Sequence, residues 1–181
     1  MAADDTPAAV LQFWRDAGAK RWFRQDDDFD GLFRARFLRA HEAAAAGRLD
    51  SWSHTPDGAL ALVLLLDQFP RNAFRGTPRM YATDAQARAA ADAAIAAGHD
   101  RNVAEDLRQF FYLPFMHSED LPDLDRCCAL MQPLGGDNLR YAHHHRDIVA
   151  RFGRFPHRNA MLGRSSSGEE ERFLAEGGFS A

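Results

Sequence analysis

The feature that most constrains the fold is an apolar run, residues 59–66, that changes abruptly into Asp67, Gln68, Arg71 and Asn72. A helix that is apolar on nearly every side leaves hydrocarbon in water unless other elements surround it. The run therefore predicts a buried central helix. The polar side chains at its end would lie near the core, where each needs a hydrogen-bond partner or a ligand. They are the first candidates for a functional site.

The bulk composition indicates a single globular domain, residues 1–181. A chain of 181 residues can bury a substantial core, and 46% hydrophobic and 27% charged residues are ordinary globular values. The net charge of −4 argues against nucleic acid, whose phosphates favour a basic surface. The apolar run is too short to cross a membrane, and residues 1–7 lack the regions of a signal peptide. We therefore expect a cytoplasmic protein with no nucleic-acid or membrane partner.

Helix start signals recur along the chain, and no segment alternates like a strand. Thr6-Pro7 and Thr55-Pro56 each combine an N-cap residue with proline at the first helical position. Ser167 and Glu170 have the spacing of a capping box. These signals predict an all-α protein of about eight or nine helices, arranged as stacked antiparallel helical hairpins.

Apolar periodicity also predicts which side chains face inward. Leu32 falls in the apolar set of its helix, and Tyr141 shares an inward face with His145. We expect Phe23 to help cover the core from a connecting segment. Residues 102–115 are expected to form one helix that its proline near the end kinks or terminates.

Two segments echo each other: Gln-Phe-Pro-Arg-Asn at residues 68–72, here called the first bend, and Arg-Phe-Pro-His-Arg-Asn at residues 154–159, the second bend. In one interpretation proline bends the chain, and arginine and asparagine hydrogen-bond to exposed helix carbonyls. In the other, the two bends face each other and their arginines form an anion pocket, because guanidinium groups match carboxylate and phosphate oxygens.

The second bend lies in a locally basic region. Residues 140–164 contain six arginines and four histidines against one acid, Asp147. Such a cluster repels itself unless it meets acids from elsewhere, with Asp67, Glu119 and Asp120 as candidates, or an anionic ligand.

His117-Ser118-Glu119 is a further candidate, because a histidine and a carboxylate near a buried Asp67 can act as acid and base. Alternatively, Ser118 or Asp120 caps a helix and His117 packs. Three consecutive histidines, residues 143–145, diverge around a helix and do not make a metal site. Phosphate-binding glycine loops and dinucleotide fingerprints are absent, so we expect no metal and no cofactor.

Several long segments together resemble the signatures of a bacterial family described as domain of unknown function 924, which is grouped with tetratricopeptide-repeat-like (TPR-like) helical folds. The segments are Val10-Leu-Gln-Phe-Trp14, Arg21-Trp22-Phe23, Ala59 through Asn72 with Arg75-Gly76-Thr77-Pro78, Arg108 through Asp120, and Phe152 through Asn159 with Leu162-Gly163-Arg164. The resemblance implies a TPR-like all-α fold and supplies no activity. The chain departs from the family pattern at residues 179–181, where that pattern continues to a final aromatic.

The residues that match the family motifs at positions of functional interest are Asp67, Gln68, Arg71, Asn72, Arg75, His117, Glu119, His145, Arg154, His157, Arg158, Asn159 and Arg164. Two functions stay open. The first is binding of a small anionic molecule by these side chains, with His117, Glu119 and Asp67 as candidate catalytic groups if acid–base chemistry occurs. The second is a helical module that binds a protein or peptide partner without catalysis. We favour the first, because a peptide groove does not require polar groups on the most buried helix.

Overall fold

The structure is a computed structural model that describes residues 6–178, and within this range the chain is helical and contains no strand. The predicted all-α class is confirmed. The family departure at residues 179–181 and most of the N-terminal segment considered above lie outside the described residues. None of the described helices is both long and apolar enough to cross a membrane.

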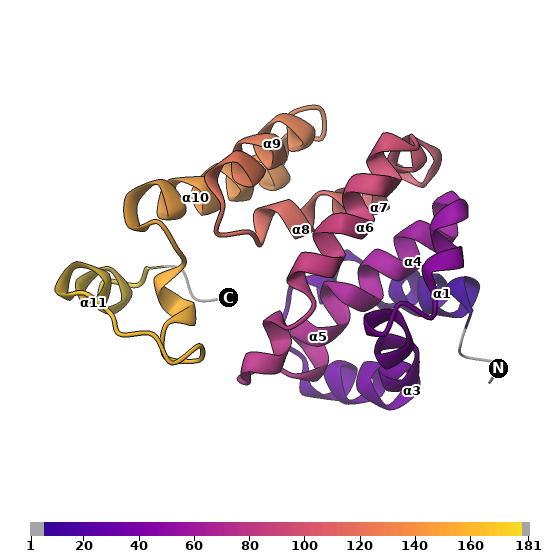
Figure 1. Ribbon diagram of the computed structural model, residues 1–181, viewed down its shortest axis with the longest axis horizontal. Helices are drawn as coiled ribbons and strands as arrows, with labels where there is room; N and C mark the ends of the chain where they lie inside the picture. Colours follow the sequence, from indigo (N-terminus) through magenta and orange to yellow (C-terminus); the bar gives the residue numbers. More distant parts are fainter. Residues whose placement is uncertain (1–5, 179–181) are drawn as a thin grey trace. The chain divides into compact units, whose positions relative to one another are not determined.

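The α-helices are α1 (Pro7–Ala17), α2 (Ala19–Trp22), α3 (Asp27–Ala45), α4 (Pro56–Leu66), α5 (Gln68–Ala73), α6 (Asp84–Ala96), α7 (Glu105–Arg108), α8 (Leu113–Met116), α9 (Leu121–Met131), α10 (Gly136–Phe152) and α11 (Gly168–Ala175). The short 3-10 helices are η1 (Asp50–His54), η2 (Pro78–Tyr81), η3 (His99–Asn102), η4 (Gln109–Phe111) and η5 (Pro156–Arg158). Figure 1 follows them along the chain.

The chain divides into two compact units, and each is described by itself. Of the described residues, the first unit holds 6–75 and 79–114, and the second holds 76–78 and 115–178. The single domain and the TPR-like stacking remain predictions.

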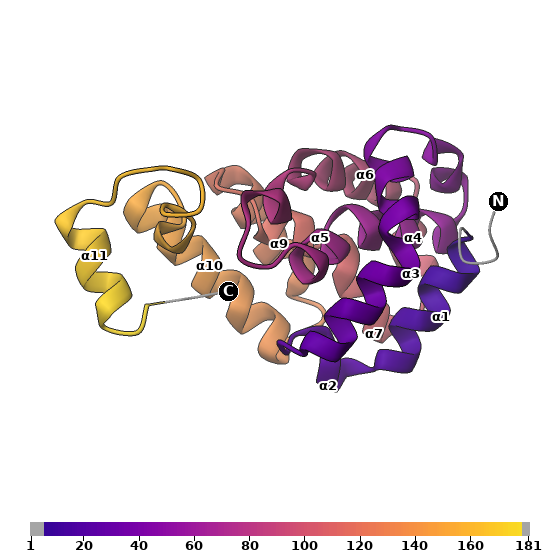
Figure 2. The ribbon, with the colours of Figure 1, turned by 90° about the horizontal axis from the view of Figure 1, so that it is seen from below.

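Helix α4 is the centre of the first unit, as its sequence predicts. Every residue from Gly58 to Leu66 is buried, and α4 packs against α1, α3 and α6. Figure 2 shows α4 lying between α3 and α6. Thr55 caps the helix by accepting a hydrogen bond from the Gly58 amide at 3.2 Å. Burial of each large aliphatic side chain contributes about 1.5–3 kcal/mol, so this helix supplies much of the unit's stability.

The first turn of α4 requires glycine at position 58. A Cβ atom there would collide with the carbonyl oxygen of Trp52 and would lie 2.8 Å from the Thr55 hydroxyl. We expect Gly58→Ala to destabilise the protein by about 1–3 kcal/mol, measured as a lower midpoint of urea unfolding. Gly31→Ala in α3 is the matched control, because a Cβ there meets no atom within 4 Å and alanine favours a helix interior. Equal stability of the two variants would contradict the close approach.

Two apolar side chains of the first unit are more than half exposed: Phe23, which still covers the core by stacking on the buried Phe110 ring, and Leu32, whose predicted inward position was wrong. Phe23 is 62% exposed, because Trp22 takes the inward position and donates its indole N–H to the Trp14 carbonyl at 2.7 Å. Leu32 is 52% exposed. The inward face of α3 is formed by phenylalanines four residues apart, and a side chain one position away is turned by about 100°.

The segment 102–115 is not one helix, contrary to the prediction. It is divided into α7, η4 and the start of α8. The side-chain amide of Gln109 donates to the Asp106 carbonyl at 2.7 Å. In a continuous helix this carbonyl would instead accept a hydrogen bond from the backbone amide four residues later. Pro114 has no N–H to continue the ladder. A side-chain bond and a proline thus break a segment whose apolar spacing is helical.

In the second unit α9 and α10 lie side by side (Figure 1). Leu124, Ile148, Val149 and Phe155 form its core. Tyr141 is 45% exposed, so its predicted inward position was wrong, whereas His145 one turn later is buried as expected. The predicted capping box is present at the start of α11, where Ser167 and the side chain of Glu170 bond to each other's backbone amides.

Candidate functional site

The first bend is held by carboxylates of the first unit. Asp67, the residue between α4 and α5, is buried and accepts a hydrogen bond from the Gln68 amide group at 2.7 Å. Arg71 lies 3.1 Å from the other oxygen of Asp67 and forms two hydrogen bonds with Asp84, of 2.9 and 3.1 Å. Burial alone would lower the pKa of Arg71, but the two carboxylates raise it. This guanidinium is therefore held charged between two acids.

Asp30 of α3 binds the remaining polar residues of the first bend region. Its two oxygens accept hydrogen bonds from the Asn72 amide at 2.6 Å and from Nε of Arg75 at 3.1 Å. The Asn72 contact joins α3 to α5 across 42 positions of sequence. The side chains thus brace the bend mainly through a carboxylate rather than through helix carbonyls, although Arg71 also donates to the Asp67 carbonyl at 2.9 Å.

In the second bend, Glu119 and Arg164 hold both sides of Phe155. The Phe155 amide donates to Glu119 at 2.8 Å, and Arg164 donates to the Phe155 carbonyl at 3.2 Å. Arg164 also forms two hydrogen bonds with Glu119, of 2.7 and 2.9 Å. Burial alone would raise the pKa of Glu119, but the bonds from Arg164 and the Phe155 amide lower it overall. Glu119 is therefore an ionised acceptor.

Glu170 of α11 holds the start of the second bend. Arg154 donates to its two oxygens at 2.6 and 2.8 Å, and also to the Ser165 carbonyl at 2.9 Å. The hydrogen bonds from Arg154, together with that from the Ser167 amide, lower the pKa of Glu170 to about 2. The fully buried Asn159 donates to the Ser166 hydroxyl at 3.1 Å.

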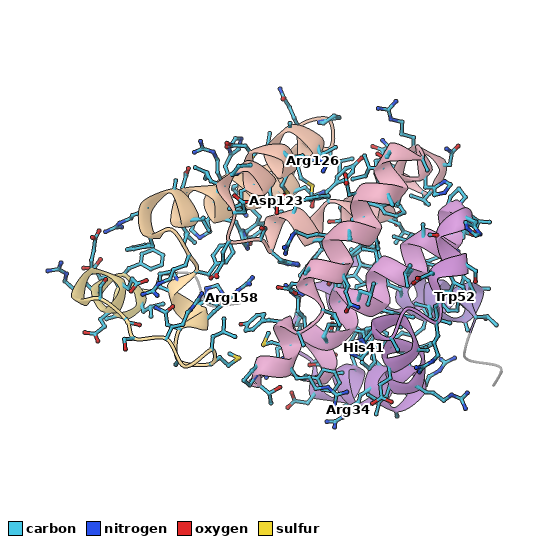
Figure 3. The ribbon with its side chains drawn as sticks, in the orientation of Figure 1. Arg34, His41, Trp52, Asp123, Arg126 and Arg158 are labelled. Atoms are coloured by element: carbon cyan, nitrogen blue, oxygen red, sulfur yellow. The ribbon has the colours of Figure 1, made fainter. Side chains whose placement is uncertain are left out.

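Arg158 is buried at the end of η5, the short segment between α10 and α11 on which Figure 3 labels it. Its guanidinium donates to the carbonyl of His117 at 2.9 Å and lies over the Phe155 ring, 4.7 Å from the centroid. Its charge also contributes to lowering the pKa of Glu119. Arg158 thus belongs to the same group of side chains as Glu119 and Arg164.

Two histidine rings contact the same phenylalanine, and a third histidine lies near both of them. The rings of His145 and His157 lie 5.7 and 5.5 Å from the Phe155 ring. His117 is close enough to both that its charge would lower their pKa values. The Nδ1 atom of His145 donates to the Tyr141 carbonyl at 2.7 Å, which leaves Nε2 as the acceptor of the neutral ring.

The imidazoles of His145 and His157 are neutral at neutral pH. Burial lowers the pKa of His145 to about 3, and the other histidines nearby add to the effect. Burial also lowers the pKa of His157 to about 4, with a further contribution from Arg158. Neutral imidazoles beside two guanidinium groups can donate and accept hydrogen bonds, and they can take up a proton if a negative charge enters the site.

The second unit therefore brings together seven of the sequence-predicted residues. They are His117, Glu119, His145, Arg154, His157, Arg158 and Arg164, and Asn159 lies in the same bend. The four predicted ligand-binding residues Gln68, Arg71, Asn72 and Arg75, together with Asp67, lie in the first unit. The shared enclosure of the two bends remains a prediction. Among the described residues, no three histidine, cysteine or acidic side chains gather as metal ligands.

Sequence reasoning missed most of the acids that meet the arginines. Glu119 binds Arg164, an arginine of the basic region, as expected. Asp67 was a candidate for the same region but binds Arg71 of the first bend, and Asp30, Asp84 and Glu170 were not considered as partners. Glu170 was identified only as a capping residue.

His41 was also missed. It is buried in α3 (Figure 3), donates Nδ1 to the Leu65 carbonyl at 2.8 Å, and stacks on Phe69 with ring centroids 4.7 Å apart. Burial lowers the pKa of His41. Its contacts are those of a core histidine that fastens α3 to α4.

Comparison with known proteins agrees with this all-helical architecture. Residues 10–178 match the model of a family described as "Bacterial protein of unknown function (DUF924)", and the chain belongs to this family. The solved structure of ATU0120, a protein of unknown function from Agrobacterium tumefaciens, is similar to it. The two share 56% sequence identity and a TM-score of 0.93, and the match covers 94% of this chain and 97% of the other. None of the curated proteins compared with the chain matches it.

Proposed function

We propose that the second unit binds a small anion at the group of side chains around Phe155, here called the Phe155 cluster: His117, Glu119, His145, His157, Arg158 and Arg164. The observation that carries the proposal is that Arg158, Arg164 and His157 lie close to the carboxylate of Glu119, and that His117 and His145 lie close to His157. These are the side chains that recognise carboxylate and phosphate oxygens in proteins.

The burial of these side chains is typical of a binding site rather than of a charged surface patch. Arg158 and His145 are each 7% exposed, and their environment penalises a charge that has no counter-charge nearby. An anion that entered would meet donors already fixed by the protein: the guanidinium of Arg158 is oriented by the His117 carbonyl and by the Phe155 ring. Donors that are ordered before binding lose less entropy when a ligand arrives.

The proposal leaves out the first bend. Its guanidinium groups, Arg71 and Arg75, already bind Asp67, Asp84 and Asp30 at hydrogen-bond distances. A ligand there would have to displace these carboxylates, just as it would have to displace Glu119 from Arg164, so in the Phe155 cluster the guanidinium expected to contact the anion is that of Arg158. The first bend is better explained as a brace of the first unit.

The alternative expectation, a protein-interaction module, has less support. The large apolar side chains exposed in the described residues include Phe23, Leu32, Tyr141 and Leu162. Phe23 stacks on Phe110 with centroids 6.0 Å apart, and the Arg140 guanidinium lies over the Tyr141 ring. Single exposed apolar residues are normal on a protein surface, so they do not define a partner.

Sulfate titration tests the proposed site. We expect sulfate, added at constant ionic strength, to bind the wild-type protein in isothermal titration calorimetry. Arg158→Gln should weaken this binding about tenfold to a hundredfold, because a hydrogen bond to a charged group is worth about 1.5–3 kcal/mol. Arg151→Gln is the matched control. Arg151 is half-exposed and pairs with Glu169 at 2.8 Å, so its loss should leave sulfate affinity unchanged.

An NMR titration of the wild-type protein removes the risk that Arg158→Gln fails to fold. The Nε–H signal of Arg158 should shift on addition of sulfate, while that of Arg151 stays in place. A wild-type protein that binds no anion, or an Arg158→Gln variant that binds with wild-type affinity, would refute the site.

A further inference from the structure

Helix α11 is attached to the second unit mainly by polar side chains. Of its eight residues only Glu170 is buried, and Phe173 and Leu174 are half-buried. Burial of apolar surface is the main source of docking energy for most helices, and α11 buries little of it. A helix of this length is not stable in water by itself. The order of α11 therefore depends on the contacts that its side chains make with the rest of the unit.

Two arginines, one in the last turn of α10 and one just after it, make these contacts. Arg151 donates to Glu169 at 2.8 and 3.0 Å. Arg154 donates to Glu170 at 2.6 and 2.8 Å. The first pair is about half exposed, and the Arg154 side chain is 31% exposed. Salt screens ion pairs that water can reach, so the attachment of α11 should weaken as the ionic strength rises.

Helix α11 lies against the segment that carries Phe155. It packs on η5, the short helix of the second bend (Figure 1). The Phe173 ring lies 5.0 Å from that of Phe152, and both pack against the core that contains Phe155. Just before α11, the Ser166 hydroxyl accepts a hydrogen bond from Asn159. Detachment of α11 would therefore uncover the second bend.

We propose that α11 is a lid on the second bend, closed by its two arginine–glutamate pairs, and that rising ionic strength opens it while α9 stays folded. Opening of the lid is also the route by which an anion reaches the Phe155 cluster. The route rests on the proposed anion site, whereas the lid itself does not.

Hydrogen exchange measured by mass spectrometry tests the lid in the wild-type protein. Raising sodium chloride from about 0.01 M to about 1 M shortens the screening length from about 30 Å to about 3 Å. Because an exposed pair shifts an equilibrium by up to about fivefold, we expect exchange of the α11 amides to become about tenfold faster. Exchange of the α9 amides should stay constant. Equal rates in α11 at both salt concentrations, or an equal rise in α9, would overturn the lid.

Arg154→Gln should open the lid at low salt. We expect exchange of the α11 amides to rise several-fold at about 0.01 M sodium chloride, and its further rise with salt to become smaller. Arg140→Gln is the matched control, because Arg140 forms an exposed pair with Asp137 near the start of α10. Its α11 amides should exchange at the wild-type rate. The wild-type salt series needs no variant, so a poorly folded Arg154→Gln still leaves the lid open to refutation.

The route is tested separately, by the rate at which sulfate enters at constant ionic strength. Line shapes of the Arg158 Nε–H signal should show sulfate binding and leaving several-fold faster in Arg154→Gln than in the wild type. Equal rates would overturn the route and leave the lid. If no anion binds, the route fails together with the proposed function, and the exchange experiment still decides whether α11 is a lid.

Discussion

Replacing Arg71 by methionine is expected to destabilise the protein by about 3–5 kcal/mol, the usual effect of removing one partner from a buried ion pair. Arg71 is the cation for two carboxylates, Asp67 and Asp84, which lie within 3.1 Å of it and are both buried. Without it, two negative charges would remain close together in the first unit. The free energy of unfolding, measured by urea denaturation at neutral pH, should fall by an amount that is a large fraction of the whole free energy of unfolding of a typical globular protein.

Arg79→Met is the matched control for this substitution. Arg79 also pairs with an acid, Glu42 at 3.3 Å, but both side chains are about half exposed. An exposed pair contributes about 0–1 kcal/mol. The double variant Arg71→Met with Asp84→Asn should recover part of the loss, because it removes one of the stranded charges. If Arg71→Met were no more harmful than Arg79→Met, the first bend would not be a brace.

The second large effect is expected on acidification. The pKa values of His145 and His157 lie at about 3 and 4, below the ordinary value of about 6.5 for an unfolded chain. Between the pKa of a histidine in the folded protein and its pKa in the unfolded chain, the unfolded chain binds more protons than the folded one. Stability therefore falls as the pH falls through this range. The loss begins near pH 6.5 and is complete for each histidine below its folded pKa. Each tenfold difference in proton affinity corresponds to about 1.4 kcal/mol, so the two together should remove several kcal/mol.

Glu119 and Glu170 act in a lower pH range. Their pKa values are lowered in the folded protein, so their contribution is present above the unfolded value of about 4.3 and is lost as the pH falls further. A decline in stability between pH 6.5 and 4.5 therefore reports the protonation of histidines. His41 in the first unit contributes in the same direction, since its pKa is also lowered.

Urea unfolding at pH 7, 6, 5 and 4.5 measures the acid effect. His145→Gln should flatten the dependence, because glutamine keeps a polar side chain but takes up no proton. His143→Gln, at an exposed position of the same helix, is the control, because His144 lies beside His145. Stability that stays constant from pH 7 to 4.5 would show that these histidines are not buried as neutral groups.

Local signals predicted the helical framework well. Thr6, Thr55 and Ser167 cap helices as their sequence context indicates, each accepting a hydrogen bond from an amide three residues later. Such caps depend on four consecutive residues, so a sequence contains all the information needed. The buried run of α4 was equally clear, because no amphipathic alternative exists for it.

Side-chain directions and ion-pair partners were harder to predict. Leu32 and Tyr141 fit an apolar stripe but fall at its edge, and the neighbouring helices decide which edge is covered. Asp30 meets Arg75 from 45 positions away. No local rule indicates such a partner, so the sequence could identify the arginines of both bends but, apart from Glu119, not the distant acids that hold them.

The carboxylate of Glu170 has two tasks that lie in different segments. It closes the first turn of α11 through the Ser167 amide, and it receives the guanidinium of Arg154. Unwinding of the last helix would therefore release the start of the second bend, and with it the support of Phe155. Residues 154–175 should consequently fold and unfold as one cooperative segment. The C-terminal helix would then stabilise the histidine-rich region.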